Sequence, residues 1–330
     1  MRATIHQPNP VTIPDIMTLQ AILTHPRLKL FFALSRTPHG VIDIATPALA
    51  ALLCLGGFPP FATVVLGLIT VFAGYTAIYA LNDLVDYRMD MAKVKAGGCE
   101  NDPECPDLDG LLVRHPLAQG VLTLKAGFLW AGGWALIAMV GAWLLNPVCL
   151  FVFLTGGLLE AIYCLLWQVT PMRALINGIV KTLGAIAAVF AVNPQPPVFF
   201  LMILIGWIFF WEIGGQNIPN DMTDIEEDRR FGARTIPVKL GLVRAGMLAM
   251  TCLVLAFLLT FILLWTSPLA FSAIHLLVVA GLGIWLLLLP ALRLVENNDR
   301  HQAMDLFNKA SHFPLSVLGV VIFRILIVYT

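Results

Sequence analysis

Hydrophobic residues along the chain gather into nine long runs separated by polar stretches. The runs span residues 41–57, 61–81, 121–145, 147–167, 174–192, 197–216, 242–266, 269–290 and 313–330. Most of them contain the ~20 residues that a helix needs to cross the ~30 Å hydrocarbon core of a bilayer. The pattern therefore predicts an all-α polytopic membrane protein with about nine transmembrane helices.

The composition excludes an ordinary soluble fold. Of the 330 residues, 59% are hydrophobic and only 12% are charged, whereas a soluble domain carries about 25% charged residues. The first 17 residues lack the basic region and apolar core of a cleavable signal peptide, so the first transmembrane helix is expected to direct insertion.

The connections between the runs alternate in character. Residues 58–60, 146–147, 193–197 and 267–268 are short and uncharged, whereas most Lys and Arg residues lie in the N-terminal tail (1–35) or in the long connections. If nine helices alternate in direction, all the basic connections share one side, which the positive-inside rule assigns to the cytoplasm. We therefore expect one domain over residues 1–330 in the plasma membrane, with a cytoplasmic N-terminus and cytoplasmic loops at 84–118 and 217–241.

Two of these loops carry nearly the same acidic motif. NDLVDYRMD at 82–90 and NDMTDIEED at 220–228 both read N-D-x-x-D-x-x-x-D, and each directly follows an apolar run. The two runs are four helices apart and therefore have the same orientation, which suggests a parallel internal repeat.

Carboxylates at this density indicate a hard divalent cation. In a helix, positions i, i+4 and i+8 share a face, and negative charge at a helix C-terminus is unfavourable unless a cation compensates it. Clustered oxygen ligands favour Mg²⁺. A solvated acidic loop is the alternative, but two matched copies on one side argue against it. The predicted metal ligands are Asn82, Asp83, Asp86, Asp90, Asn220, Asp221, Asp224 and Asp228, of which Asp86, Asp90, Asp224 and Asp228 are the predicted catalytic residues.

Basic residues near both motifs are consistent with a phosphate ligand. Mg²⁺ usually bridges to substrate phosphate oxygens, and guanidinium groups bind phosphate through paired hydrogen bonds. Arg114, Lys181 and Arg234 are therefore candidates for binding a diphosphate. Each arginine alone is also explained as a positive-inside anchor, and Lys181 as a side chain that snorkels to the membrane surface.

Polar and aromatic residues continue both helices below the acidic motifs. Tyr75 and Tyr79 precede the first motif, and Glu212 and Gln216 precede the second. An intramembrane glutamate is by default a functional residue, so these four side chains are predicted to line an acceptor pocket. A further stripe at Glu160, Tyr163 and Trp167 is interpreted as helix packing with an interfacial tryptophan.

With these motifs, the chain resembles the UbiA superfamily of intramembrane prenyltransferases. NDLVDYRMD is similar to the first motif of that family, and NDMTDIEEDRRFGARTIP to its second. SRTPHG at 35–40 and FNKASHFPL at 307–315 are similar to the entries of its first and last helices. The resemblance implies a ring of helices around a central cavity that opens laterally to lipid.

The resemblance also implies Mg²⁺-dependent transfer of an isoprenoid chain from its diphosphate to an acceptor, here expected to be an aromatic quinone precursor. Nucleic acid is not an expected partner. The metal–diphosphate role of the family carries over to Asn82, Asp86, Asp90, Asp224 and Asp228. The chain departs from the family in an acidic insert containing Cys99 and Cys105, which precedes RHPLAQG at 114–120 and is read as two loop thiols, a disulfide or a metal clip.

Three alternative functions remain open at this stage. An enzyme of the same fold could cyclise or hydrolyse the prenyl diphosphate, and an assay without acceptor separates these reactions from transfer. An ion-coupled transporter would place its carboxylates near the bilayer midplane, whereas these lie at one surface. A binding or scaffold protein would retain a dead site, against which the intact aspartates of both motifs argue.

Overall fold

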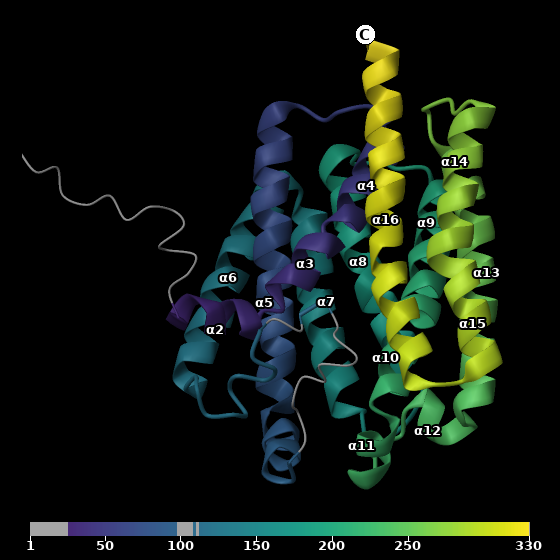
Figure 1. The fold of residues 1–330 in the computed structure, drawn as a ribbon. Coiled ribbons are helices and arrows are strands. Elements are labelled where there is room, and N and C mark those ends of the chain that lie inside the picture. Colours follow the sequence, from purple (N-terminus) through teal and green to yellow (C-terminus); the bar gives the residue numbers. More distant parts are fainter. Residues whose placement is uncertain (1–25, 98–107, 110–111, 330) are drawn as a thin grey trace, which may run out of the picture.

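The protein is a bundle of long helices (Figure 1). A computed structural model describes residues 26–97, 108–109 and 112–329. Within this part of the chain, nine helices are long and apolar enough to cross a membrane, which confirms the predicted all-α membrane class. Most of the N-terminal tail and the cysteines at 99 and 105 lie outside the described residues.

The first half of the bundle contains five of the nine spans. Its helices are α2 (Pro26–Leu34), α3 (Thr37–Asp43), α4 (Ala45–Leu55), α5 (Phe61–Lys95), α6 (Leu124–Leu145), α7 (Pro147–Leu165) and α8 (Arg173–Val192). Helices α3 and α4 together form the first span, Thr37–Leu55. The left-handed conformation of Arg36, with φ 42°, separates α2 from α3.

The second half contains four spans and several short helices. Its elements are α9 (Val198–Trp211), the π-helix η1 (Glu212–Asn217), α10 (Ile218–Thr223), α11 (Ile225–Arg230), α12 (Ile236–Leu240), α13 (Leu242–Thr266), α14 (Ala273–Gly283), the π-helix η2 (Ile284–Leu288), α15 (Leu289–Asn297) and α16 (Arg300–Tyr329).

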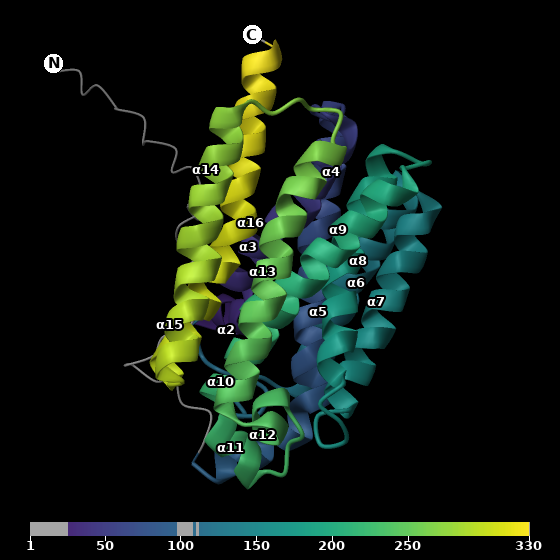
Figure 2. The same ribbon diagram turned by 90° about the vertical axis from the view of Figure 1, so that its right-hand side faces the viewer.

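The spans pack side by side into a closed ring. Contacts run from α5 through α6, α7, α8, α9, α13 and α15 to α16, and α3 and α4 close the ring between α16 and α5. The C-terminal end of α5 and the short helices α10, α11 and α12 lie at the same end of the bundle in both views (Figures 1 and 2). That end carries both acidic motifs.

Several helix boundaries differ from the sequence-based prediction. Residues 84–95 were expected in a loop, but they continue α5, whose last turn places Lys93 and Lys95 where the helix dipole favours positive charge. Residues 217–241 likewise form short helices rather than an open loop. The last helix begins 13 residues before the predicted start at 313, because Ala303, Leu306 and Ala310 extend its buried stripe.

The π-helix η1 packs tightly against two neighbouring helices. A Cβ atom on Gly214 would lie 2.7 Å from the backbone oxygen of Ala249 in α13, and one on Gly215 would lie 2.8 Å from the Cβ of Ala310 in α16. Both distances are too short for real contacts, so glycine at these positions lets the three backbones approach closely. Short π-helical turns are rare and occur frequently at functional sites.

Replacing Gly215 with alanine should therefore destabilise the protein. The added methyl group must displace α16, and overpacking of this kind costs about 1–3 kcal/mol, so a lower midpoint in a detergent thermal-unfolding assay is expected. Gly133→Ala on α6 is the matched control, because its Cβ would meet nothing within 4 Å. An equal loss of stability in both variants would contradict this account of η1.

Candidate functional site

The first acidic motif lies entirely on α5 and presents carboxylates on two sides of the helix. Asp83 and Asp90 are seven residues, or about two turns, apart and both contact the Nδ1 atom of His115, at 3.1 and 3.0 Å. Burial by itself lowers the pKa of His115, but the hydrogen bonds with Asp83 and Asp90 outweigh it and raise the pKa to about 9. The imidazolium thus compensates two buried carboxylates.

The other side of the same motif faces α7. The Nδ2 atom of Asn82 donates a hydrogen bond to Glu160 Oε1 at 2.8 Å and a longer one to Cys164 Sγ at 3.3 Å. Asp86 is one helical turn further along α5 and is half-buried. The predicted alignment of Asn82, Asp86 and Asp90 is therefore incomplete, because Asp90 joins Asp83 at His115.

The second motif is divided between two short helices. The conformation of Asp224, with φ −104° and ψ 11°, ends α10 and begins α11, so the predicted single face through Asn220, Asp224 and Asp228 does not form. The break separates the surroundings of Asp224 and Asp228 from those of Asn220, which lines the central cavity.

Each aspartate of the second motif has its own partner. Arg173 Nη2 donates to Asp221 Oδ1 and Arg114 Nη2 donates to Asp224 Oδ2, both at 3.0 Å. The hydroxyl of Thr235 donates to Asp228 Oδ2 at 3.0 Å. Burial, together with the neighbouring Asp221 carboxylate, raises the pKa of Asp228 to about 7. The Asp228 carboxyl therefore holds its proton more tightly than an exposed aspartate does.

Consecutive residues of one loop connect the two motifs. Arg114 binds Asp224 of the second motif, while His115 binds Asp83 and Asp90 of the first. His115 has a positive φ of 50°, a conformation that costs energy for a residue with a side chain and occurs often at functional sites. The structure thus brings the two motifs together, as the sequence predicted.

Four further contacts, at Tyr163 of α7, at Trp167 just beyond it and between Lys93 and Glu227, reinforce this junction. The Arg173 guanidinium lies 4.6 Å from the centre of the Tyr163 ring, and Asn217 Nδ2 donates to the Tyr163 hydroxyl at 3.1 Å. Lys93 lies over the Trp167 ring and pairs with Glu227 at 3.1 Å. The stripe at Glu160, Tyr163 and Trp167, interpreted from the sequence as helix packing, therefore serves the acidic site directly.

A cavity of about 630 Å³ extends from the motifs into the bundle. The first residues of both motifs line it, together with all four predicted acceptor-pocket residues and an otherwise largely apolar wall. These polar lining residues are Asn82, Asn220, Tyr75, Tyr79, Glu212 and Gln216. Tyr75 and Tyr79 stack with their ring centres 6.3 Å apart, and Gln216 accepts a hydrogen bond from Ser311 of α16 at 3.1 Å.

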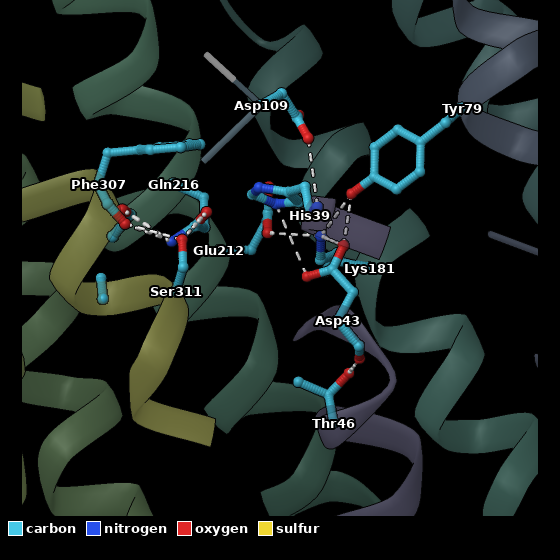
Figure 3. Close-up of polar contacts among 12 residues, drawn as sticks. His39, Asp43, Thr46, Tyr79, Asp109, Lys181, Glu212, Gln216, Phe307 and Ser311 are labelled. Atoms are coloured by element: carbon cyan, nitrogen blue, oxygen red, sulfur yellow. Dashed lines mark hydrogen bonds and ion pairs between the residues drawn. The ribbon is translucent and has the colours of Figure 1, made fainter. Parts of the chain in front are cut away.

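Lys181 belongs to the inner part of this cavity (Figure 3). Its Nζ atom lies 2.6 Å from Asp43 Oδ2 of α3 and 3.4 Å from the hydroxyl of Tyr79, and that hydroxyl also donates to Asp43. Lys181 therefore does not snorkel to the membrane surface. Its ammonium group is compensated inside the bundle.

The structure does not bring Arg234 into the cavity. Its side chain is exposed, and Nη1 donates to the backbone oxygen of Val169 at 3.2 Å. Arg36, by contrast, lines the cavity wall. Burial lowers the pKa of Arg36, but the nearby Asp83 and Asp109 carboxylates raise it by more.

Sequence analysis missed three residues of this site: Asp43, His115 and Arg173. Asp43 lies in an apolar run and carries the same signal that identified Glu212, an ionisable group within a membrane span. His115 directly follows Arg114, which was selected. Arg173 begins α8, and nothing in the sequence near it indicates that its partner is Asp221.

The chain is similar in sequence to known membrane prenyltransferases. Residues 44–313 match the UbiA prenyltransferase family. Digeranylgeranylglyceryl phosphate synthase from Thermococcus kodakarensis is 24% identical over 66% of this chain and 71% of its own length. The corresponding values for 4-hydroxybenzoate octaprenyltransferase from Aromatoleum aromaticum are 28%, 65% and 68%.

A solved structure shares the fold. A UbiA homologue from Archaeoglobus fulgidus, determined with DMAPP and Mg²⁺ bound, superimposes with a TM-score of 0.64 at 16% identity. The match covers 88% of this chain and 99% of that protein.

Proposed function

Because the chain belongs to the UbiA prenyltransferase family, we propose that it transfers an isoprenoid chain from a prenyl diphosphate to an acceptor held in the central cavity. The observation that carries the proposal is the cavity itself. It begins at Asn82 and Asn220, the first residues of the two acidic motifs, and continues along apolar walls between the helices. A diphosphate at the acidic end would leave its hydrocarbon chain in the apolar part.

The acidic end suits Mg²⁺ by the chemistry of its donors. Carboxylate and amide oxygens of Asn82, Asp86, Asp224 and Asp228 are ligands that Mg²⁺ accepts, and Mg²⁺ is commonly held by a few carboxylates together with substrate phosphates. When bound, the ion would neutralise charge that builds on the departing diphosphate. The Archaeoglobus homologue, determined with DMAPP and Mg²⁺, supports this proposal.

The residues of the chain itself would orient both substrates. Arg114 and Arg36 would contact diphosphate oxygens, since guanidinium groups bind phosphate through charge-assisted hydrogen bonds. The bond between allylic C1 and the diphosphate oxygen breaks, and its electron pair leaves with the diphosphate. A new bond forms between C1 and the acceptor, which loses a proton. The apolar wall excludes water that would otherwise capture the allylic cation.

The acceptor we propose is an aromatic quinone precursor. The stacked rings of Tyr75 and Tyr79 support it, because they offer an aromatic surface inside the cavity. The two relatives compared above differ in this respect, since one is named for a hydroxybenzoate and the other for a glyceryl phosphate. We further propose that the acidic end faces the cytoplasm from the plasma membrane, in agreement with the charge asymmetry of the loops.

Removal of divalent metal tests this proposal directly. Purified protein with EDTA should show no transfer from a radiolabelled prenyl diphosphate, and added Mg²⁺ should restore it, because several carboxylates and a diphosphate would otherwise repel one another. Product is measured by extraction into organic solvent and mass spectrometry, with and without acceptor. Product that forms equally well in EDTA would refute the metal assignment, and a prenyl product without acceptor would indicate cyclisation or hydrolysis.

A further inference from the structure

Four side chains from four helices meet at the inner wall of the cavity (Figure 3). They are Asp43 of α3, Tyr79 of α5, Lys181 of α8 and Glu212 of η1. The Lys181 ammonium is 2.6 Å from Asp43 Oδ2 but 3.8 Å from Glu212 Oε2. The lysine is therefore paired closely with Asp43 and only loosely with Glu212.

Glu212 presents one carboxylate oxygen that has no hydrogen-bonding partner. Its Oε1 atom accepts a hydrogen bond from Asn177 Nδ2 at 2.8 Å. In the described part of the chain, nothing donates a hydrogen bond to the buried Oε2 atom, although Glu212 is only 4% exposed and lines the cavity. A buried polar atom left in this state is costly, and a ligand that donates a hydrogen bond would remove the cost.

We infer that the acceptor is an uncharged molecule with a hydroxyl group, and that this hydroxyl donates a hydrogen bond to Oε2 of Glu212. The inference rests on the proposed transfer function and narrows the acceptor within it. An aromatic acceptor would then be a neutral phenol rather than a phenol that also carries a carboxylate or a phosphate group next to Glu212.

The balance of charge on the inner wall favours a neutral acceptor. Two carboxylates, Asp43 and Glu212, surround a single ammonium group, so an additional anion would meet net negative charge in a low-dielectric cavity. A hydroxyl group meets no such repulsion. It also supplies the donor that the Glu212 carboxylate lacks.

The other basic side chains among the described residues of the cavity wall already face carboxylates. His39 Nε2 lies 3.8 Å from Asp43 Oδ1, whereas Lys181 contacts the other carboxylate oxygen, Oδ2. Arg36 interacts electrostatically with Asp83 and Asp90 of the first acidic motif and with Asp109. Among the described residues of the cavity wall, an acceptor carboxylate beside Glu212 would therefore meet no positive charge that is not already beside another carboxylate.

Matched acceptor pairs test the inference with the wild-type protein. One pair is 4-methylphenol and 4-hydroxybenzoate, and the other is a prenyl glycerol ether and its phosphate. With Mg²⁺ and a fixed prenyl diphosphate, kcat/KM is expected to be at least about tenfold higher for the neutral member of a pair that reacts. Equilibrium binding of the same four probes to the full-length protein gives the same comparison without turnover. Equal or tighter binding of the anionic probes would overturn the inference.

The variant Glu212→Gln tests the residue itself. It removes the charge and places an amide donor at the wall, so the preference for the neutral member of each pair should fall by about tenfold or more. Glu296→Gln on α15 is the matched control, because Glu296 is exposed outside the cavity, and it should keep the wild-type preference. An unchanged preference in folded Glu212→Gln protein would count against the inference. If that variant does not fold, the wild-type binding comparison alone decides.

Failure of the inference can be distinguished from failure of the proposed function. Mg²⁺-dependent binding of the prenyl diphosphate involves the acidic end and is measured separately, without acceptor. If the donor binds but anionic acceptors are preferred, only the inference fails. If the protein neither binds nor consumes a prenyl diphosphate, the proposed function fails first.

Discussion

Replacing Asp86 or Asp224 with alanine is expected to reduce prenyl transfer by about two orders of magnitude or more. Asp86 lies on α5 about one turn beyond Asn82, which lines the cavity, and Asp224 lies where α10 ends and α11 begins. Each substitution removes one negatively charged group from the oxygen ligands that are proposed to hold Mg²⁺ against the diphosphate. The rate is measured with a radiolabelled prenyl diphosphate at saturating acceptor.

The control for this prediction lies in the same segment. Glu226 is between Asp224 and Asp228 in sequence, but its side chain is 83% exposed and pairs only with Arg229 in the described structure. Glu226→Ala should therefore keep close to the wild-type rate. Wild-type rates in both aspartate variants would show that neither carboxylate holds the metal ion.

The second large effect is expected at Lys181. Lys181→Met should lower the free energy of unfolding by about 3–5 kcal/mol, because it leaves the buried Asp43 carboxylate without its cation. The double variant Asp43→Asn/Lys181→Met removes both charges and should recover most of the loss. Thermal or denaturant unfolding in detergent micelles, followed for these two variants and the wild type, measures the effect.

A surface pair provides the comparison for the buried one. Lys309 and Asp305 on α16 are 2.8 Å apart, with side chains that are 29% and 35% exposed. Lys309→Met should cost no more than about 1 kcal/mol, since exposed ion pairs contribute little. If the double variant at positions 43 and 181 were no more stable than Lys181→Met alone, the pairing of these two residues would not explain the effect.

The general arrangement of the protein could be predicted from its sequence because membrane spans depend on local composition. A run of about 20 apolar residues needs no distant partner to be recognised, and all nine predicted runs correspond to helices in the described part of the chain. The meeting of the two acidic motifs was also predictable, since matched motifs after helices of equal orientation lie on one side of the bilayer.

The partners of individual side chains could not be predicted in this way. Lys181 and Asp43 are 138 positions apart in the chain, and their contact depends on how α3 closes the ring between α5 and α16. Asp43 interrupts the first apolar run. Glu212 was predicted to be functional because it is an ionisable residue within a membrane span, and the same criterion applies to Asp43. The contact of His115 with Asp83 and Asp90 depends on a left-handed backbone conformation that its sequence does not indicate.

The π-helical turn η1 affects the direction in which the side chains of the second motif point around the helix axis. A π-turn accommodates one residue more than an α-helical turn, so everything beyond it is rotated by about 100° relative to an uninterrupted helix. Glu212 and Asn220 can both line the cavity across this turn. Shortening the segment by one residue would turn the aspartates that follow away from those of α5, while leaving the membrane-spanning length of the helix almost unchanged.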